Sequence, residues 1–178
     1  MTFKIRAASK ADTDALCNLS HQAFGAEEDG LIAAFARDLL VTDSTPPTFV
    51  LIAEAEQTAI GFVGFSPVFM ADSDKPQAYI LAPLGVLPGY QKQGVGTALI
   101  EYGIERLKST AVDVLLVYGD PGYYGRFGFD ATTGRNFRPP FELEYSFGWQ
   151  AMLLNGGHAG DTAKEFTCVD ALNKPELW

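Results

Sequence analysis

The segment from Leu84 to Thr97 limits the possible folds of this chain more than any other. It runs from apolar residues through a glycine-rich loop into a helical pattern. Glycine permits a tight turn and lets a ligand approach the main chain closely. The N-terminus of the following helix offers N–H groups that have no acceptor within the helix, together with a partial positive charge. The segment therefore predicts an anion site suited to phosphate. It lacks the Gly-Lys-Ser/Thr ending of a P-loop and the third glycine of a dinucleotide fingerprint.

The residues on either side of this loop predict a parallel crossover. Tyr79–Val86 is apolar enough for a buried strand, in which Pro83 implies a bulge or a gap in the ladder. Gly94–Lys108 places apolar residues on one helical face, and Val112–Tyr118 is continuously apolar, as in a strand covered on both sides. Strand, helix and strand in this order form a right-handed crossover.

The N-terminal third predicts a strand, two helices and a hairpin. Phe3–Ala7 alternates apolar and polar residues, and Ser9-Lys10-Ala11-Asp12 forms a capping box ahead of a helix. A second helix is expected around Leu31–Leu39, followed by an antiparallel pair at Thr48–Glu54 and Ile60–Phe69. Further on, the sequence indicates a β-like stretch at Leu143–Leu154 and no clear period after Asn155.

Composition narrows the class of protein. The 178 residues fit a single domain, 1–178, and 47% of them are hydrophobic, enough for a core without disulfides or a structural metal. Cys17 and Cys168 have no C-x-x-C spacing, so no metal site is expected. The chain contains no long apolar run and no secretory signal, which indicates a cytoplasmic protein that does not enter a membrane. The formal charge of −9 opposes nucleic-acid binding and suits a cationic partner.

Two motifs resemble the GNAT superfamily of N-acetyltransferases, in particular a bacterial predicted-acetyltransferase subgroup. Gln91-x-x-Gly94-x-Gly96, with Pro88 ahead of it, is similar to the family's pyrophosphate loop. Tyr124-x-Arg126-x-Gly128-Phe129 is similar to the segment that follows the family's fifth strand. The chain departs from the commoner pattern at Asp120, where asparagine is usual, and in having a shorter helix before the tyrosine. The motifs span about residues 80–130 within a core of about 3–130, leaving a β-rich segment at 131–178.

The resemblance implies an α/β (α+β) fold with a mixed central sheet flanked by helices. The sheet would be mostly antiparallel, with Tyr79–Val86 and Val112–Tyr118 as a parallel, splayed pair. It also implies acetyl-CoA as co-substrate and no metal. The implied cofactor-binding residues line the pantetheine arm, hold the pyrophosphate or follow the fifth strand: Leu84, Gly85, Val86, Gln91, Lys92, Gln93, Gly94, Val95, Gly96, Thr97, Tyr124 and Arg126.

The expected chemistry is direct attack of an amine on the thioester in a ternary complex. Tyr124 is the expected proton donor to the thiolate, because a phenol can protonate such a leaving group. An amine attacks only as its free base, so a proton acceptor is needed, and the candidates are Asp120, Glu28 and its acidic neighbours, and His21. The alternative for the acidic run is a solvated helix start, where carboxylates interact favourably with the helix dipole. The alternative for Arg126 is an ordinary surface cation.

The partner expected is the amine of a small molecule or peptide. The sequence leaves its identity and the acyl length open. A non-catalytic acyl-CoA-binding module is the alternative, because the strand at Tyr79–Val86 carries no carboxylate. Family members often pair, so a homodimer is also possible.

Overall fold

The computed structural model of the protein describes residues 2–25, 29–71, 78–159 and 163–178. Within these ranges the strands are β1 (Lys4–Ala7), β2 (Phe49–Ala55), β3 (Thr58–Met70), β4 (Ala78–Val86), β5 (Val114–Tyr118), β6 (Phe137–Arg138), β7 (Trp149–Leu153) and β8 (Lys164–Cys168). The helices are α1 (Thr13–Ala23), α2 (Asp29–Val41), α3 (Val95–Lys108), α4 (Pro121–Tyr124) and α5 (Ala131–Gly134). The eight predicted elements from Phe3 to Tyr118 are all present, with small shifts at their ends.

The strands form a mixed sheet in the order β1-β2-β3-β4-β5-β7, and β8 pairs with both β3 and β6. Strand pairs β1–β2, β2–β3, β3–β8 and β5–β7 are antiparallel, whereas β4–β5 and the two-residue pair β6–β8 are parallel. The predicted α/β fold, with a mostly antiparallel sheet and a parallel β4–β5 pair, is confirmed. None of the helices in the described ranges combines the length and the apolar character needed to cross a membrane.

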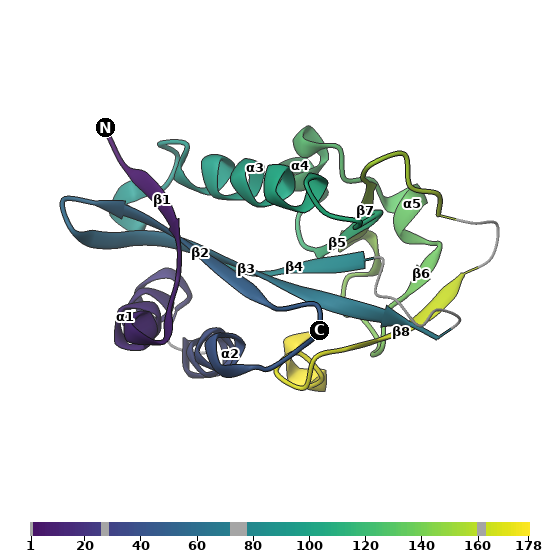
Figure 1. Ribbon diagram of the computed structural model, residues 1–178, viewed down its shortest axis with the longest axis horizontal. Coiled ribbons are helices and arrows are strands. Elements are labelled where there is room, and N and C mark those ends of the chain that lie inside the picture. The colour runs from purple at the N-terminus through teal and green to yellow at the C-terminus, as the bar shows by residue number, and fades with distance from the viewer. Residues whose placement is uncertain (1, 26–28, 72–77, 160–162) are drawn as a thin grey trace. The chain divides into compact units, whose positions relative to one another are not determined.

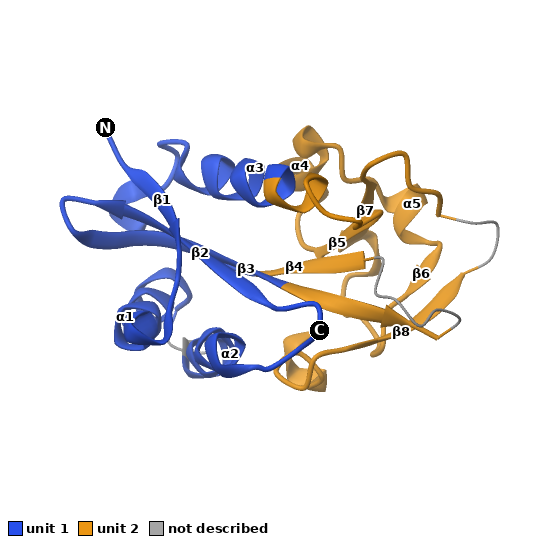
Figure 2. Ribbon diagram, in the orientation of Figure 1, with its two compact units in different colours: residues 1–65, 83–105 blue, residues 66–82, 106–178 orange. Residues whose placement is uncertain are grey.

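The chain divides into two units, residues 1–65 with 83–105 and residues 66–82 with 106–178 (Figure 2). In the first unit, α1 and α2 lie on one side of β1–β3 and α3 lies on the other (Figure 1). Two glycines allow the close packing of these layers. A Cβ on Gly85 of β4 would lie 3.3 Å from the Ala23 Cβ at the end of α1, and one on Gly103 of α3 would lie 2.1 Å from the Phe65 ring. The helices therefore pack directly on the aromatic core of the sheet.

In the second unit, β5 lies between β4 and β7. The parallel ladder runs from Ala78↔Val114 to Leu81↔Val117 and ends there, while β4 itself continues to Val86. The ladder thus ends just before Pro83, whose ring nitrogen has no hydrogen to donate. Helix α5 packs against β7 through Gly134, where a Cβ would lie 2.7 Å from the carbonyl oxygen of Trp149.

The structure differs from the sequence analysis at two places in the C-terminal region, which contains β6, β7 and β8. The β-like stretch at Leu143–Leu154 is a strand only over Trp149–Leu153. The Tyr145 N–H donates instead to the hydroxyl oxygen of Tyr118, at 2.9 Å. The tail was expected to lack periodic structure, yet Lys164–Cys168 forms β8, with buried Phe166 and Cys168 alternating with exposed residues.

Candidate functional site

The first unit carries the glycine-rich loop predicted to bind an anion. Strand β4 ends at Val86, a 3-10 turn follows at Pro88–Tyr90, and α3 begins at Val95. The Leu87 N–H donates to the Ile60 carbonyl at 3.0 Å, which ties the end of β4 to β3. The order of strand, loop and helix is therefore the predicted one.

Two side-chain amides hold the loop in shape. Gln91 Nε2 donates to the Val86 carbonyl at 3.1 Å, and Gln93 Nε2 donates to the Gly89 carbonyl at 2.8 Å. Gly94 has φ +84°, a left-handed conformation that favours glycine, and nothing lies within 4 Å of where its Cβ would be. The loop thus turns sharply and leaves the space around Gly94 open.

The start of α3 provides the main-chain donors. The first hydrogen bond within the helix runs from the Ala98 N–H to the Gly94 carbonyl at 2.9 Å. The N–H groups of Val95 and Gly96 precede this bond and have no acceptor within the helix. Lys92 is exposed in the loop and adds a positive charge. The Val95 side chain, by contrast, is only 1% exposed, so Val95 can offer a ligand its main chain alone.

The second unit carries the segment that contains Asp120, Tyr124 and Arg126. Asp120 is the N-cap of α4, since its Oδ1 accepts from the Gly122 N–H at 2.8 Å. Its carbonyl oxygen accepts from the Tyr124 N–H at 2.9 Å. The structure therefore gives this predicted proton acceptor a definite role in holding the short helix, and it leaves the carboxylate exposed.

Tyr124 packs tightly within the same segment. Its ring meets those of Tyr123 and Phe129 edge-on, with centroids 5.1 and 5.8 Å away. A Cβ on Gly119 would lie 2.4 Å from its Cε2, so only glycine fits beneath the ring. Burial raises the pKa of the Tyr124 phenol above its ordinary value, and the neighbouring Tyr123 adds to this effect. The hydroxyl group is protonated at neutral pH, as an unperturbed phenol also is, and the raised pKa makes it a weaker acid.

Arg126 is exposed and stacks on aromatic rings. Its Cζ lies 4.1 Å from the centroid of Tyr123 and 4.9 Å from that of Phe127. These contacts orient the guanidinium group as cation–π pairs. The predicted role of Arg126 in cofactor binding stays a prediction.

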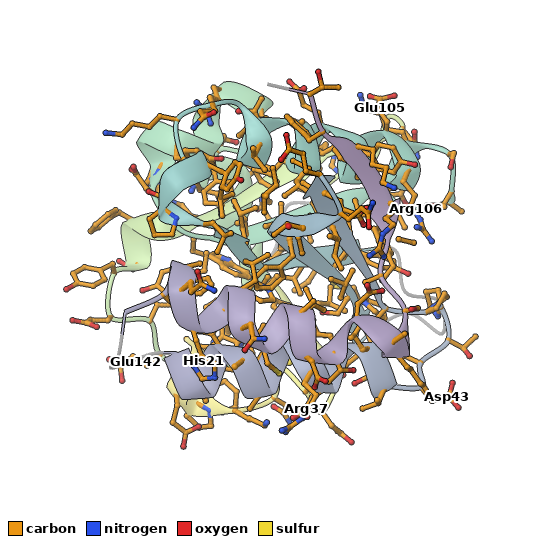
Figure 3. All side chains as sticks on the ribbon, turned by 90° about the vertical axis from the view of Figure 1, so that its left-hand side faces the viewer. His21, Arg37, Asp43, Glu105, Arg106 and Glu142 are labelled. Atoms are coloured by element: carbon orange, nitrogen blue, oxygen red, sulfur yellow. The ribbon has the colours of Figure 1, made fainter. Side chains whose placement is uncertain are left out.

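The other candidate proton acceptors, His21 and Glu28, are not part of the segment that contains Tyr124. His21 is exposed on α1 (Figure 3). Glu28 lies outside the described residues, so its predicted role as a proton acceptor stays a prediction. Within the described ranges, no group of three or more His, Cys, Asp or Glu side chains could hold a metal ion.

Sequence reasoning missed the buried amide that supports this region. Gln150 on β7 is 1% exposed, and its Nε2 donates to the carbonyls of Gly119 and Gly148 at 3.1 and 3.3 Å. A polar residue inside a strand of apolar neighbours was the available signal, because buried amides need partners. The exposed aromatic residues Tyr145 and Phe147 were also missed, because the segment was interpreted as strand.

Comparison with known proteins identifies the family of the chain. The model of the acetyltransferase (GNAT) family matches residues 13–129. YjhQ, an uncharacterized N-acetyltransferase of Escherichia coli strain K12, is 33% identical over 157 residues, which cover 85% of this chain and 84% of YjhQ.

Solved structures agree with this match. The crystal structure of the GNAT family N-acetyltransferase YhbS from E. coli in complex with CoA has a TM-score of 0.80 and 25% identity, and the match covers 97% of this chain and 92% of that one. A GNAT family acetyltransferase from Brucella melitensis, solved in complex with acetyl-CoA, has the same fold, with a TM-score of 0.70, 23% identity, and 97% and 99% coverage.

Proposed function

The chain belongs to the GNAT family of acetyltransferases, and from this premise we propose that it is an N-acetyltransferase. In this proposal it transfers the acetyl group of acetyl-CoA to an amine of a small molecule or peptide, by direct attack in a ternary complex. The observation that carries the proposal is the loop from Gln91 to Thr97, with its positive-φ glycine and its main-chain donors at the start of α3.

The loop would bind the pyrophosphate of acetyl-CoA. Helix N-terminal N–H groups suit an anion, and the Lys92 ammonium supplies further positive charge. The main chain of Leu84–Val86 would pair with the pantetheine arm, because the parallel ladder of β4 ends at Leu81. CoA in the YhbS crystal and acetyl-CoA in the Brucella protein support this assignment by similarity.

The transfer needs one proton donor and one proton acceptor. The amine nitrogen forms a bond to the acetyl carbon, the carbon–sulfur bond breaks, and the CoA thiolate takes a proton. Tyr124 would supply that proton or donate a hydrogen bond to the sulfur, since a phenol is protonated at neutral pH. The amine loses a proton in the same reaction. Among the carboxylate candidates Asp120 and Glu28, only Asp120 lies within the described residues, and its exposed carboxylate would accept this proton directly or through water.

The test is isothermal titration of the protein with acetyl-CoA and, separately, with ATP and NAD. We expect acetyl-CoA alone to bind, with a dissociation constant on the order of micromolar. Gly94→Glu should weaken this binding at least about tenfold, because it places a negative charge in the phosphate loop.

Two controls separate charge from other effects. Gly94→Ala introduces the same left-handed strain without charge, and Gly30→Glu adds the same charge on α2, where nothing lies within 4 Å of the new Cβ. Both should retain acetyl-CoA affinity better than Gly94→Glu does. Absence of acetyl-CoA binding by the unaltered protein would overturn the loop assignment.

A non-catalytic acyl-CoA-binding module is the second candidate. It is favoured by one feature, the absence of any acidic residue on β4. Tyr124→Phe distinguishes the two: an enzyme loses thiol release from acetyl-CoA in the presence of amines, whereas a binding module has no turnover to lose.

A further inference from the structure

A cavity of about 440 Å³ opens in the second unit, where β5 ends. Its lining residues come from two segments that are far apart in the sequence: Tyr118, Gly119, Asp120, Tyr145, Phe147 and Gly148. The aromatic side chains make this lining largely apolar, and one carboxylate interrupts it. Lysine and arginine are absent from the six lining residues.

Two lining residues, Gly119 and Gly148, are joined by hydrogen bonds and are called the floor of the cavity below. The Gly119 N–H donates to the Gly148 carbonyl at 2.9 Å, and the buried Gln150 amide donates to the carbonyls of both glycines. A Cβ on Gly148 would lie 3.0 Å from the Gly119 carbonyl oxygen and 3.1 Å from the Tyr118 ring. A side chain at Gly148 would therefore crowd the Gly119 carbonyl and the Tyr118 ring.

The walls of the cavity are the exposed aromatic side chains of Tyr145 and Phe147. Tyr145 is 53% exposed and Phe147 is 65% exposed, and their ring centroids lie 5.8 Å apart. The Tyr118 hydroxyl accepts from the Tyr145 N–H, which fixes the first wall to the end of β5. Large exposed aromatics that gather around a hollow are typical of a surface that binds a partly apolar ligand.

The charge around the cavity selects for a cation. Asp120 Oδ1 accepts the Gly122 N–H, and a carboxylate has further acceptor positions beyond this bond. The neighbouring Glu144 raises the pKa of the Tyr145 phenol through a hydrogen bond and its negative charge, so a second carboxylate lies at the aromatic wall. An ammonium group fits both the carboxylates and the faces of the aromatic rings.

The cavity also adjoins the proposed proton donor. Gly119 forms part of its floor, and the Tyr124 ring packs on that same glycine. A ligand that contacts Gly119 therefore binds next to the residue against which the Tyr124 ring packs.

We propose that this cavity is the acceptor site, and that it binds primary amines whose amino group is attached to an aromatic or bulky alkyl group. The amino group pairs with Asp120, and the apolar group packs against Tyr145 and Phe147. The role as acceptor site rests on the proposed acetyltransferase function, whereas the binding of such amines does not.

The probe is 2-phenylethylamine, compared with its neutral analogue 2-phenylethanol and the anion 3-phenylpropionate. Each is titrated calorimetrically into the protein, with and without saturating CoA. We expect the amine to bind at least about tenfold more tightly than the alcohol, because a charge-assisted hydrogen bond is lost in the alcohol. The anion should bind more weakly still.

Two variants locate the binding. Asp120→Asn keeps a good N-cap for α4, since asparagine caps helices as well as aspartate does. It should weaken 2-phenylethylamine about tenfold and leave 2-phenylethanol unchanged. Phe147→Ala should weaken both ligands roughly fivefold, because both lose apolar contact with the ring. Tyr102→Ala, which removes an exposed aromatic residue of α3 outside the cavity lining, should weaken neither.

Three results would overturn the proposal: equal affinity for the amine and the alcohol, unchanged amine affinity in both cavity variants, or a dimer that Phe147→Ala dissociates without changing amine affinity. The last result would make the aromatic walls an interface between two copies of the chain. Amine binding without acetyl-CoA binding would refute the acetyltransferase function and keep the site. Acetyl-CoA binding without amine binding would refute the proposed amine site and leave the acetyltransferase function standing.

Discussion

The contact between Gly119 and Tyr124 provides a direct test of the catalytic role of the tyrosine. In Gly119→Ala, the new Cβ would lie 2.4 Å from Tyr124 Cε2 and 3.0 Å from Cδ2, whereas ordinary contacts begin at 3.4 Å. The ring must therefore move by about 1 Å. A displacement of this size in a catalytic group costs about a hundredfold in rate, or about 2.7 kcal/mol of transition-state stabilisation.

The assay is release of the CoA thiol at saturating acetyl-CoA and amine. We expect Gly119→Ala to lower kcat about a hundredfold, and saturation with both substrates keeps weaker binding of either one from lowering the rate. Gly125→Ala is the matched control, since Gly125 has a right-handed φ of −56° and nothing within 4 Å of its Cβ position. It should retain full activity, and thermal unfolding should show that both variants fold.

A double-variant cycle separates Tyr124 from the neighbouring cavity. Tyr124→Phe alone should lower kcat at least about a hundredfold, the usual contribution of a general acid. If Gly119→Ala acts by displacing the hydroxyl group, it should add less than about threefold in the Tyr124→Phe background. A folded Gly119→Ala variant with more than half of the original kcat would refute the reasoning. Losses that multiply fully would show that the substitution acts through the cavity instead.

Two predictions concern stability, measured as the free energy of unfolding in urea. Gly103→Ala should lower it by about 1–3 kcal/mol, because the new Cβ would lie 2.1 Å from the buried Phe65 ring; Gly30→Ala, with open space around it, should raise it by up to about 1 kcal/mol. Similar effects at the two helical glycines would contradict this packing argument. A hydrogen bond from Arg6 lowers the pKa of Asp12 to about 2 in the folded protein, compared with about 3.9 in the unfolded chain. The ionised carboxylate therefore stabilises the folded state above about pH 3.9. This stabilisation is lost as the pH falls towards 2. Asp12→Asn should therefore cost roughly 1 kcal/mol at pH 7 and little at pH 2, and an equal cost at both pH values would show that the ion pair contributes nothing.

The elements that follow local rules were predictable from the sequence. Helix α3 begins at Val95, one residue after the predicted start, because Gly94 takes a left-handed conformation that ends the loop. The hairpin of β2 and β3 was also predicted, although its two turn residues, Glu56 and Gln57, adopt positive φ without being glycine or asparagine. In each case the apolar period determines the element and a short turn determines its end.

The elements that depend on distant partners were not predictable. Strand β8 has the right alternation, since Phe166 and Cys168 are buried between exposed residues, yet five residues give a weak signal. Its partner on β3 is the stretch Val68–Met70, about a hundred residues earlier in the chain. Likewise, the loop before β7 is held by a hydrogen bond from the Tyr145 N–H to the Tyr118 hydroxyl, and no local sequence pattern predicts this bond.

The candidate site shows the same division between local and distant information. The sequence motif predicts Tyr124, whereas the N-cap role of Asp120 was not predicted. Nothing local predicts that the Gln150 amide holds the carbonyls of Gly119 and Gly148 together. Because Gly119 touches the Tyr124 ring on α4 and also forms part of the cavity floor, a change in this glycine affects both the proposed proton donor and the proposed acceptor site. The two roles can therefore be separated only by substitutions that reach one of them alone, Tyr124→Phe for proton donation and Phe147→Ala for amine binding.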